Sequence, residues 1–277
     1  MDMKFAICNE TFNDRTVEEG FALAAECGYE GIEIAPFMLA SYVTELSAAR
    51  RAEIRRAIEK SGLSTVGLHW LLAKTEGFHL TSPDPSVRSR TRDYLIELAQ
   101  CCADLGGRVL VLGSPQQRNV LPEVTRTQAE GYAIEVFEGL LPHLERTKTT
   151  LALEPLGPQE TNFVNTAEEA VEIIQKLSSP HIQLHLDCKA MASETIPIPD
   201  LIRKNSQYMV HFHANDPNRL GPGFGELDFV PIFEALLDVG YKGWVSVEVF
   251  DYLPGPERIA RESIAYMQRC LTQAQKS

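Results

Sequence analysis

The chain has 277 residues, of which 44% are hydrophobic and 23% are charged. This composition is typical of a globular protein with a full apolar core, and it excludes the fibrous and intrinsically disordered classes. The 26 basic and 38 acidic residues give a formal net charge of -12, which weighs against a nucleic acid or an anionic membrane as a partner because like charges repel.

Short apolar runs alternate with longer amphipathic segments along the chain, and we interpret the runs as buried strands and the segments as helices. The predicted strands cover residues 4–8, 31–34, 64–68, 108–112, 150–153, 182–186, 208–212 and 244–247. The predicted helices cover residues 16–27, 45–60, 85–105, 123–147, 166–177, 229–237 and 256–275, with one more short helix near Asp200.

This succession of strand–helix units predicts an α/β fold, the (β/α)8 TIM barrel, rather than an open sheet. The sequence contains no obvious linker, low-complexity tract or second domain, so residues 1–277 are predicted to form a single TIM-barrel domain. The longest irregular segments, residues 191–199 and 213–228, would be strand-to-helix loops. In such barrels these loops carry the functional residues.

Polar residues recur at or just after the ends of successive predicted strands. They are Glu33, His69, Glu154, Asp187, His213 and Glu248. The last four follow consecutive strands, whose ends meet on one side of the barrel mouth. Three carboxylates packed together would repel one another, and a divalent cation removes that cost. Three oxygen ligands and one imidazole suit Mn²⁺, Mg²⁺ or Co²⁺, so these four residues predict a metal site.

Other polar residues near the strands each have two interpretations. Glu33 either lines the barrel mouth or ties down a neighbouring strand. His69 and Trp70 suit contact with a sugar, because an imidazole hydrogen-bonds hydroxyl groups and an aromatic face stacks on sugar C–H groups. Trp70 could instead pack in the core. His185 shares the strand face of Asp187, and we expect it at most to support that residue.

Four segments carry a resemblance to a known family: LALEPLGPQETNFVNTAEEA, LHLDCKAM, HFHANDPNRLGPGFGELDF and WVSVEVF. They resemble the xylose-isomerase-like TIM-barrel superfamily of sugar isomerases and epimerases, in particular its ketose 3-epimerases of the tagatose/psicose type. The resemblance implies that Glu154, Asp187, His213 and Glu248 bind one divalent metal ion, with Mn²⁺ favoured over Mg²⁺ or Co²⁺. It also implies that Glu154 and Glu248 are the catalytic acid/base pair.

The resemblance extends to substrate contacts. It implies that Glu160 and Arg219 hold substrate oxygens, and that His211 contacts the substrate or supports the metal site. The chain departs from the ketose 3-epimerases at one position, where Ala190 replaces a histidine that touches the substrate. The metal ligands are therefore complete, whereas part of the sugar-binding surface differs.

The implied reaction is proton transfer at the carbon alpha to a carbonyl, through a cis-enediolate. It would serve ketose 3-epimerisation or aldose–ketose isomerisation of a free sugar. A metal-dependent dehydratase of the inosose or dehydroshikimate type begins with the same proton removal and stays open as an alternative. A non-catalytic sugar-binding barrel would not require two glutamates at the metal.

Two further alternatives have less support. A three-zinc DNA-repair endonuclease on the same barrel would need additional ligands, but Ala190 stands at one such position and the fourth strand is followed by Gly113 and Ser114 rather than a histidine. A phosphorylated substrate could be held at Gly113–Ser114 or at the glycine-rich segment 221–225, but a glycine-rich turn alone is weak support.

Six cysteines without C-x-x-C spacing indicate a reduced, intracellular protein. The N-terminus has no signal-peptide pattern and no apolar run reaches the length of a membrane span. We therefore expect a cytoplasmic protein with no membrane partner. Its expected partner is a small-molecule sugar and no nucleic acid, and the resemblance implies a homodimer or homotetramer.

Overall fold

The computed structural model describes residues 3–276 and contains a closed barrel of eight parallel strands. The strands are β1 (Lys4–Cys8), β2 (Gly31–Ile34), β3 (Ser64–Leu68), β4 (Val109–Leu112), β5 (Thr150–Leu153), β6 (Ile182–Asp187), β7 (Met209–Ala214) and β8 (Trp244–Val247). Each strand pairs with the next one in sequence, and β8 pairs with β1. The predicted (β/α)8 TIM barrel is confirmed; residues 1, 2 and 277 of the predicted domain lie outside the described residues.

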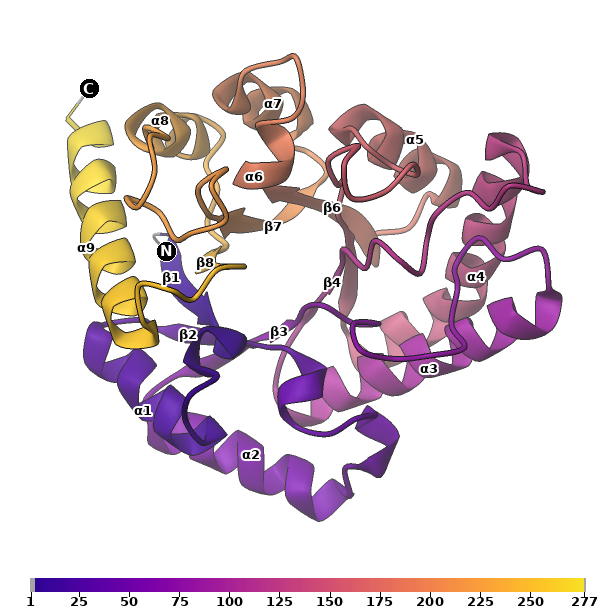
Figure 1. Ribbon diagram of the computed structural model, residues 1–277, viewed down its shortest axis with the longest axis horizontal. Helices are drawn as coiled ribbons and strands as arrows, with labels where there is room; N and C mark the ends of the chain where they lie inside the picture. The colour runs from indigo at the N-terminus through magenta and orange to yellow at the C-terminus, as the bar shows by residue number, and fades with distance from the viewer. Residues whose placement is uncertain (1–2, 277) are drawn as a thin grey trace.

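Helices surround the barrel as an outer ring (Figure 1). They are α1 (Val17–Cys27), α2 (Ala48–Lys60), α3 (Pro85–Asp104), α4 (Arg126–Thr147), α5 (Ala167–Leu177), α6 (Cys188–Met191), α7 (Ile198–Asn205), α8 (Val230–Asp238) and α9 (Pro256–Ala274). The sequence pattern does not predict α6 or the short 3-10 helices Asn9–Phe12, Pro36–Met38 and Val43–Glu45. These elements are too short to show a helical period. Within residues 3–276, no helix is long and apolar enough to cross a bilayer.

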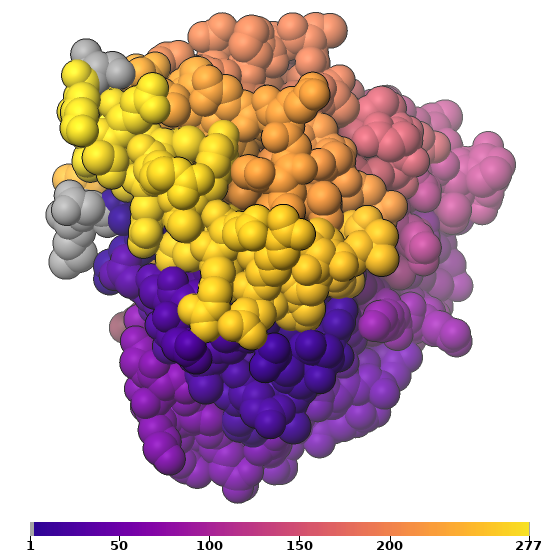
Figure 2. Space-filling view, turned by 60° about the vertical axis from the view of Figure 1, so that its left-hand side comes forward, coloured from indigo at the N-terminus to yellow at the C-terminus, as the bar shows by residue number. Residues whose placement is uncertain are grey.

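Local capping explains where some helices begin and end. Thr16 forms a capping box with Glu19 at the start of α1, which stops at Gly28 with a φ of 98° in the left-handed region. Beyond this turn, the hydroxyl of Tyr29 donates to the backbone carbonyl of Ala260 in α9 at 2.9 Å. The first and last long helices therefore pack side by side and join the two ends of the chain (Figure 2).

A register shift in the β6–β7 pair aligns polar residues of the two strands. Beyond the shift, His185 lies level with His211 and Asp187 lies level with His213, with Val210 as the extra residue. Because alternate residues of a strand share a face, all four of these polar side chains point to the barrel interior. The pairing continues to this point, so Asp187 and His213 lie within β6 and β7 rather than after the predicted strands.

Candidate metal and substrate site

The polar residues predicted at the strand ends converge at the C-terminal end of the barrel. One ligand atom from each of Glu154, His185, Asp187 and His213 lies within 4.8 Å of all the others, and the four residues are buried. Glu248 adjoins this group, with its Oε2 3.1 Å from Nδ1 of His213. The structure therefore clusters three of the four predicted ligands with His185 and places the fourth, Glu248, against His213.

A glycine makes room for the carboxylate of Glu154. A Cβ at Gly113, directly after β4, would lie 1.7 Å from Oε2 of Glu154, so no larger residue fits there without displacing the carboxylate. Burial, together with the charges of Glu248 and Asp187, raises the pKa of Glu154 well above its ordinary value. Ionising this group is costly unless a positive charge lies beside it.

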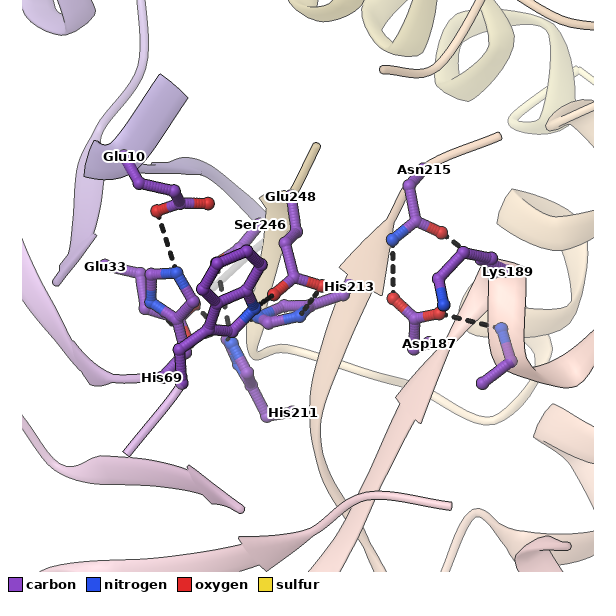
Figure 3. Close-up of polar contacts among 12 residues, drawn as sticks. Glu10, Glu33, His69, Asp187, Lys189, His211, His213, Asn215, Ser246 and Glu248 are labelled. Carbon is purple, nitrogen blue, oxygen red and sulfur yellow. Dashed lines mark hydrogen bonds and ion pairs between the residues drawn. The ribbon is translucent and has the colours of Figure 1, made fainter. Parts of the chain in front are cut away.

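Backbone and side-chain donors orient the carboxylate of Asp187 (Figure 3). Its Oδ1 accepts from the backbone N–H of Ala190 at 2.8 Å, and its Oδ2 accepts from Nδ2 of Asn215 at 2.5 Å. Asn215 is itself fixed by the backbone N–H of Lys189, which donates to its Oδ1 at 2.8 Å. Burial and the charge of Glu248 raise the pKa of Asp187 to about 6. The remaining lone pairs of Asp187 are thus held in a set direction.

Trp70 and His213 hold Glu248 from two sides. The Nε1–H of Trp70 donates to Oε1 of Glu248 at 2.6 Å, and Nδ1 of His213 lies 3.1 Å from Oε2. Burial alone would raise the pKa of Glu248, but the charge of His213 and its hydrogen bond lower it below the ordinary value. Glu154 and Glu248 therefore have opposite pKa shifts, a pattern that can separate a proton donor from a proton acceptor.

Trp70 forms an aromatic wall of the site despite an unusual backbone conformation. Its φ of 51° lies in the left-handed region, which costs energy for a bulky residue. Its ring stacks on Phe250, with centroids 5.8 Å apart at an angle of 22°, and lies 5.6 Å from the ring of Phe37. These contacts and the bond to Glu248 hold the indole against the cavity, rather than in the core.

A carboxylate–histidine network joins Glu33 to His211 and to the candidate metal ligand His213 (Figure 3). Nε2 of His211 lies 2.7 Å from Oε2 of Glu33, and Nε2 of His213 lies 3.1 Å from Oε1. Burial would raise the pKa of Glu33, but the charges of both histidines and their hydrogen bonds hold it well below its ordinary value. Glu33 therefore neither lines the mouth nor ties down a neighbouring strand; it connects β2 to β7 across the interior.

Two residues predicted to contact a sugar have their imidazoles buried inside the barrel and not at the lining of the cavity. His69 is fully buried with its Nε2 2.8 Å from Oε2 of Glu10, and His211 is fully buried against Glu33. Neither belongs to the residues that line the cavities of the site. Glu10 and Glu33 hold both imidazoles inside the barrel, so a sugar contact of His69 is not supported, and for His211 the other predicted role, support of the metal site, stays a prediction.

Two adjoining cavities open above the candidate metal ligands. The first has a volume of about 560 Å³, and its lining includes Trp70, Glu154, Glu160, Arg219, Glu248 and Phe250. The second has a volume of about 510 Å³, and its lining includes Gln159, Lys189, Ser193 and Pro217 together with Glu160, Arg219 and Phe250 of the first. The structure thus places the predicted substrate residues Trp70, Glu160 and Arg219 at the lining of the first cavity, which shares Glu160 and Arg219 with the second.

Fixed charged groups stand where the two cavities meet. Nζ of Lys189 lies 2.7 Å from Oε2 of Glu160 and 4.6 Å from the centre of the Phe250 ring. The backbone carbonyl of Arg219 accepts from the N–H groups of Phe250 and Asp251 at 2.9 and 3.1 Å. Lys189, next to the substituted position 190, therefore brings a cation to the wall of the second cavity.

Asp216 organises the glycine-rich segment 221–225. Its Oδ2 accepts from the backbone N–H groups of Gly223 and Gly225, both at 3.1 Å, and its Oδ1 accepts from Leu227 at 3.0 Å. An anion-binding turn needs free N–H groups. Because Asp216 already takes up these donors, the segment does not offer them to a phosphate.

Two charged residues of the site lie outside the predicted metal ligands and sugar contacts. The guanidinium of Arg118 is buried, donates to the backbone carbonyls of Leu112 and Val164, and interacts electrostatically with Glu154. Burial lowers the pKa of Arg118 to about 10. Glu10, the partner of His69, follows the end of β1 by two residues. The strand-end pattern could have found Glu10, but it contains no signal for a residue as far from its strand as Arg118.

The donor set fits a divalent cation. Burial, and after it the charge of Glu248, raises the pKa values of Glu154 and Asp187. His185 has no hydrogen-bond partner at either ring nitrogen among the described residues. Burial keeps the pKa of His185 well below its ordinary value, so its imidazole is uncharged and can offer a lone pair to a metal ion. A cation among these groups would remove the repulsion and accept the free lone pairs.

Comparisons with known proteins agree with this geometry. Residues 21–270 match the family described as xylose isomerase-like TIM barrel. The chain is 25% identical over 276 residues to 3-dehydro-D-guloside 4-epimerase of Escherichia coli K12, covering 97% of this chain and 100% of the relative. It is 27% identical over 235 residues to D-psicose 3-epimerase of Ruminiclostridium cellulolyticum, covering 83% of this chain and 77% of the relative.

The same fold occurs in solved structures. The crystal structure of D-psicose 3-epimerase with D-tagatose from Clostridium cellulolyticum H10 superposes with a TM-score of 0.85 at 22% identity, covering 97% of this chain and 99% of that chain. The curated relatives are epimerases, which are isomerases, the enzyme class that the sequence predicts. From its closed eight-stranded barrel and the match over residues 21–270, the chain belongs to the xylose isomerase-like TIM barrel family.

Proposed function

We propose that this protein is a divalent-cation-dependent sugar epimerase or isomerase that moves a proton at the carbon alpha to a carbonyl. One observation carries the proposal: Glu154 after β5 and Glu248 after β8 line one cavity and have opposite pKa shifts. Proton transfer between two positions of a bound sugar needs such a pair, with one group ready to accept and one ready to donate.

In the proposed mechanism, Glu248 removes the proton alpha to the carbonyl and Glu154 returns one to the cis-enediolate. Return to the opposite face of the same carbon is epimerisation, and return to the adjoining carbon is isomerisation. Glu154, Asp187, His213 and Glu248 would hold a divalent ion, most favourably Mn²⁺. When bound, this ion supplies Lewis-acid stabilisation of the charge that develops on the carbonyl oxygen.

The remaining residues would bind and orient the substrate. Trp70 presents its ring to the C–H face of a sugar, and Glu160 and Arg219 are placed to bond hydroxyl oxygens. His69 and His211 would act indirectly, because each bonds a carboxylate inside the barrel: Glu10 for His69 and Glu33 for His211. The occupied N–H groups of segment 221–225 favour a free sugar over a phosphorylated one.

A substituted keto-sugar is a second candidate substrate beside a free ketose. The second cavity adjoins the first at Glu160, Arg219 and Phe250, and would accept a group attached to the sugar ring. The Escherichia coli relative is named for a guloside, a sugar that carries a substituent. The epimerase relatives favour both candidates over the dehydratase alternative. The cytoplasmic location and the homodimer or homotetramer stay predictions.

Solvent-exchange measurements test the proposal directly. The full-length protein with Mn²⁺ is incubated in D₂O with ketoses, aldoses, keto-inositols and keto-glycosides. We expect one class of compound to gain deuterium at a carbon alpha to its carbonyl, without loss of water, and chelation to stop the exchange. Loss of water would indicate the dehydratase. Exchange that survives exhaustive chelation, or no exchange in any compound, would contradict the proposal.

A further inference from the structure

Within the cluster of Glu154, His185, Asp187 and His213, His185 is the residue for which the resemblance implies no metal-binding role. It is fully buried, and neither of its ring nitrogens has a hydrogen-bond partner among the described residues. An imidazole needs at least one partner to offset the cost of removal from water. By contrast, Glu33 bonds His211 and Glu10 bonds His69, so each neighbouring histidine already has a carboxylate partner.

The position of His185 points to the same centre as the predicted ligands. One ligand atom of His185 lies within 4.8 Å of ligand atoms of Glu154, Asp187 and His213. Ligands on opposite sides of one ion, each bound at roughly 2.0–2.2 Å, lie roughly 4 Å apart. The His185 ring also stands edge-on to that of His213, with centroids 4.2 Å apart. The four groups therefore lie at separations close to those between the ligands of a single cation.

The register of the sheet brings His185 to this position. Without the shift between β6 and β7, His185 would lie level with Val210; with it, His185 lies level with His211 and Asp187 with His213. Such irregularities commonly redirect a side chain beside a functional site. Two strands thus present their inward polar residues at matching heights.

We propose that His185 is a direct ligand of the divalent ion, in addition to the four residues assigned from the resemblance. The inference rests on the proposed metal dependence and deepens it, because a second imidazole changes which ions the site prefers. Imidazole nitrogen suits Mn²⁺, Co²⁺ and Zn²⁺ better than Mg²⁺, which favours oxygen ligands and water. The site is therefore selective against Mg²⁺.

Pulsed EPR of the Mn²⁺-loaded, full-length protein counts the histidine nitrogens bound to the metal. We expect two coordinated nitrogens in the native protein and one in His185→Leu, with Mn²⁺ affinity at least about tenfold lower in the variant. The Mn²⁺ to Mg²⁺ affinity ratio should also decrease. His181→Gln is the matched control, since it removes an imidazole just before the same strand, where His181 bonds the carbonyl of Thr149, and should retain two nitrogens.

The native count needs no variant, so a folding defect in His185→Leu does not affect it. One nitrogen in the native protein, or an unchanged count in a folded His185→Leu, overturns this inference while leaving the proposed function intact if solvent exchange persists. Absence of any bound Mn²⁺ overturns both.

Discussion

The outer and inner faces of the barrel wall follow different rules. The outer face is apolar: Leu110 and Leu151 pack into the main hydrophobic cluster with the helices. The inner face carries Glu33, His185 and His211, all fully buried. Burial of the leucines stabilises the fold by roughly 1.5–3 kcal/mol each, whereas burial of unpaired polar groups costs free energy. On the inner face Glu33 and His211 offset this cost by bonding each other, whereas His185 has no partner among the described residues.

The inner face itself is divided. Along β4 and β5 it holds a small apolar cluster of Val109, Val111 and Ala152, as expected of a packed barrel interior. Along β6 and β7 histidines take the corresponding places. The apolar part supports Glu154, which extends from β5 past Gly113 toward the histidines. The inward-facing polar residues of β6 and β7 thus lie where the candidate ligands meet, and Glu33 of β2 reaches them from across the interior.

Removal of one inner carboxylate should have the largest effect. Glu248→Gln should lower kcat by about 10²- to 10⁴-fold at saturating Mn²⁺, because it removes the proposed proton acceptor. Turnover of the best substrate from the D₂O panel provides the measurement. Glu138→Gln on the exposed side of α4 is the control and should leave kcat unchanged. Near-normal turnover in Glu248→Gln would refute the assigned role.

A cavity on the outer face should affect stability and not chemistry. Leu144 in α4 is fully buried between helix and barrel. Leu144→Ala should reduce the free energy of unfolding by about 2–5 kcal/mol, through lost apolar contacts and the cavity left behind. Denaturant unfolding measures this loss, and kcat per folded molecule should stay unchanged. A large decrease in kcat of a fully folded Leu144→Ala variant would contradict the idea that the outer face affects stability alone.

A methyl group at Gly113 should disturb the site without opening a cavity. Gly113→Ala should displace Glu154 and weaken Mn²⁺ binding by about 10- to 100-fold. The matched control is Gly131→Ala in α4, where a Cβ has free space. It should raise stability by about 0.5–1 kcal/mol, as alanine favours a helix over glycine. Calorimetric titration with Mn²⁺ measures the affinity of each variant. Equal Mn²⁺ affinities in Gly113→Ala and Gly131→Ala would contradict a clash between a Cβ at position 113 and the carboxylate of Glu154.

The smallest effect concerns pH. A cation binds the ionised form of Asp187, whose pKa without metal is about 6, so Mn²⁺ affinity should rise as pH increases through that value. From pH 7 to pH 5 the affinity should fall about tenfold, because about nine tenths of Asp187 is then protonated. The raised pKa of Glu154 acts in the same direction. Affinity that is constant or higher at pH 5 would contradict this protonation scheme.

Local sequence patterns were sufficient for the order of the strands and the longer helices and for the residues at the strand ends. Apolar runs and helical periodicity depend on neighbouring residues only, so the strand positions agree with the predicted ranges to within two residues. Glu154, Asp187 and Glu248 could be identified as candidate site residues because they lie at strand ends, which parallel strands bring to one end of a barrel.

Only the tertiary structure decided how these side chains meet. The β6–β7 register, the free nitrogens of His185, the pairing of His69 with Glu10 and the buried position of Arg118 depend on contacts between distant segments. Barrel closure sets those contacts, and a shift of one residue changes which side chains lie level. The sequence alone therefore determined the barrel and where its polar residues fall along the chain, whereas closure and register decided their partners and their charge states.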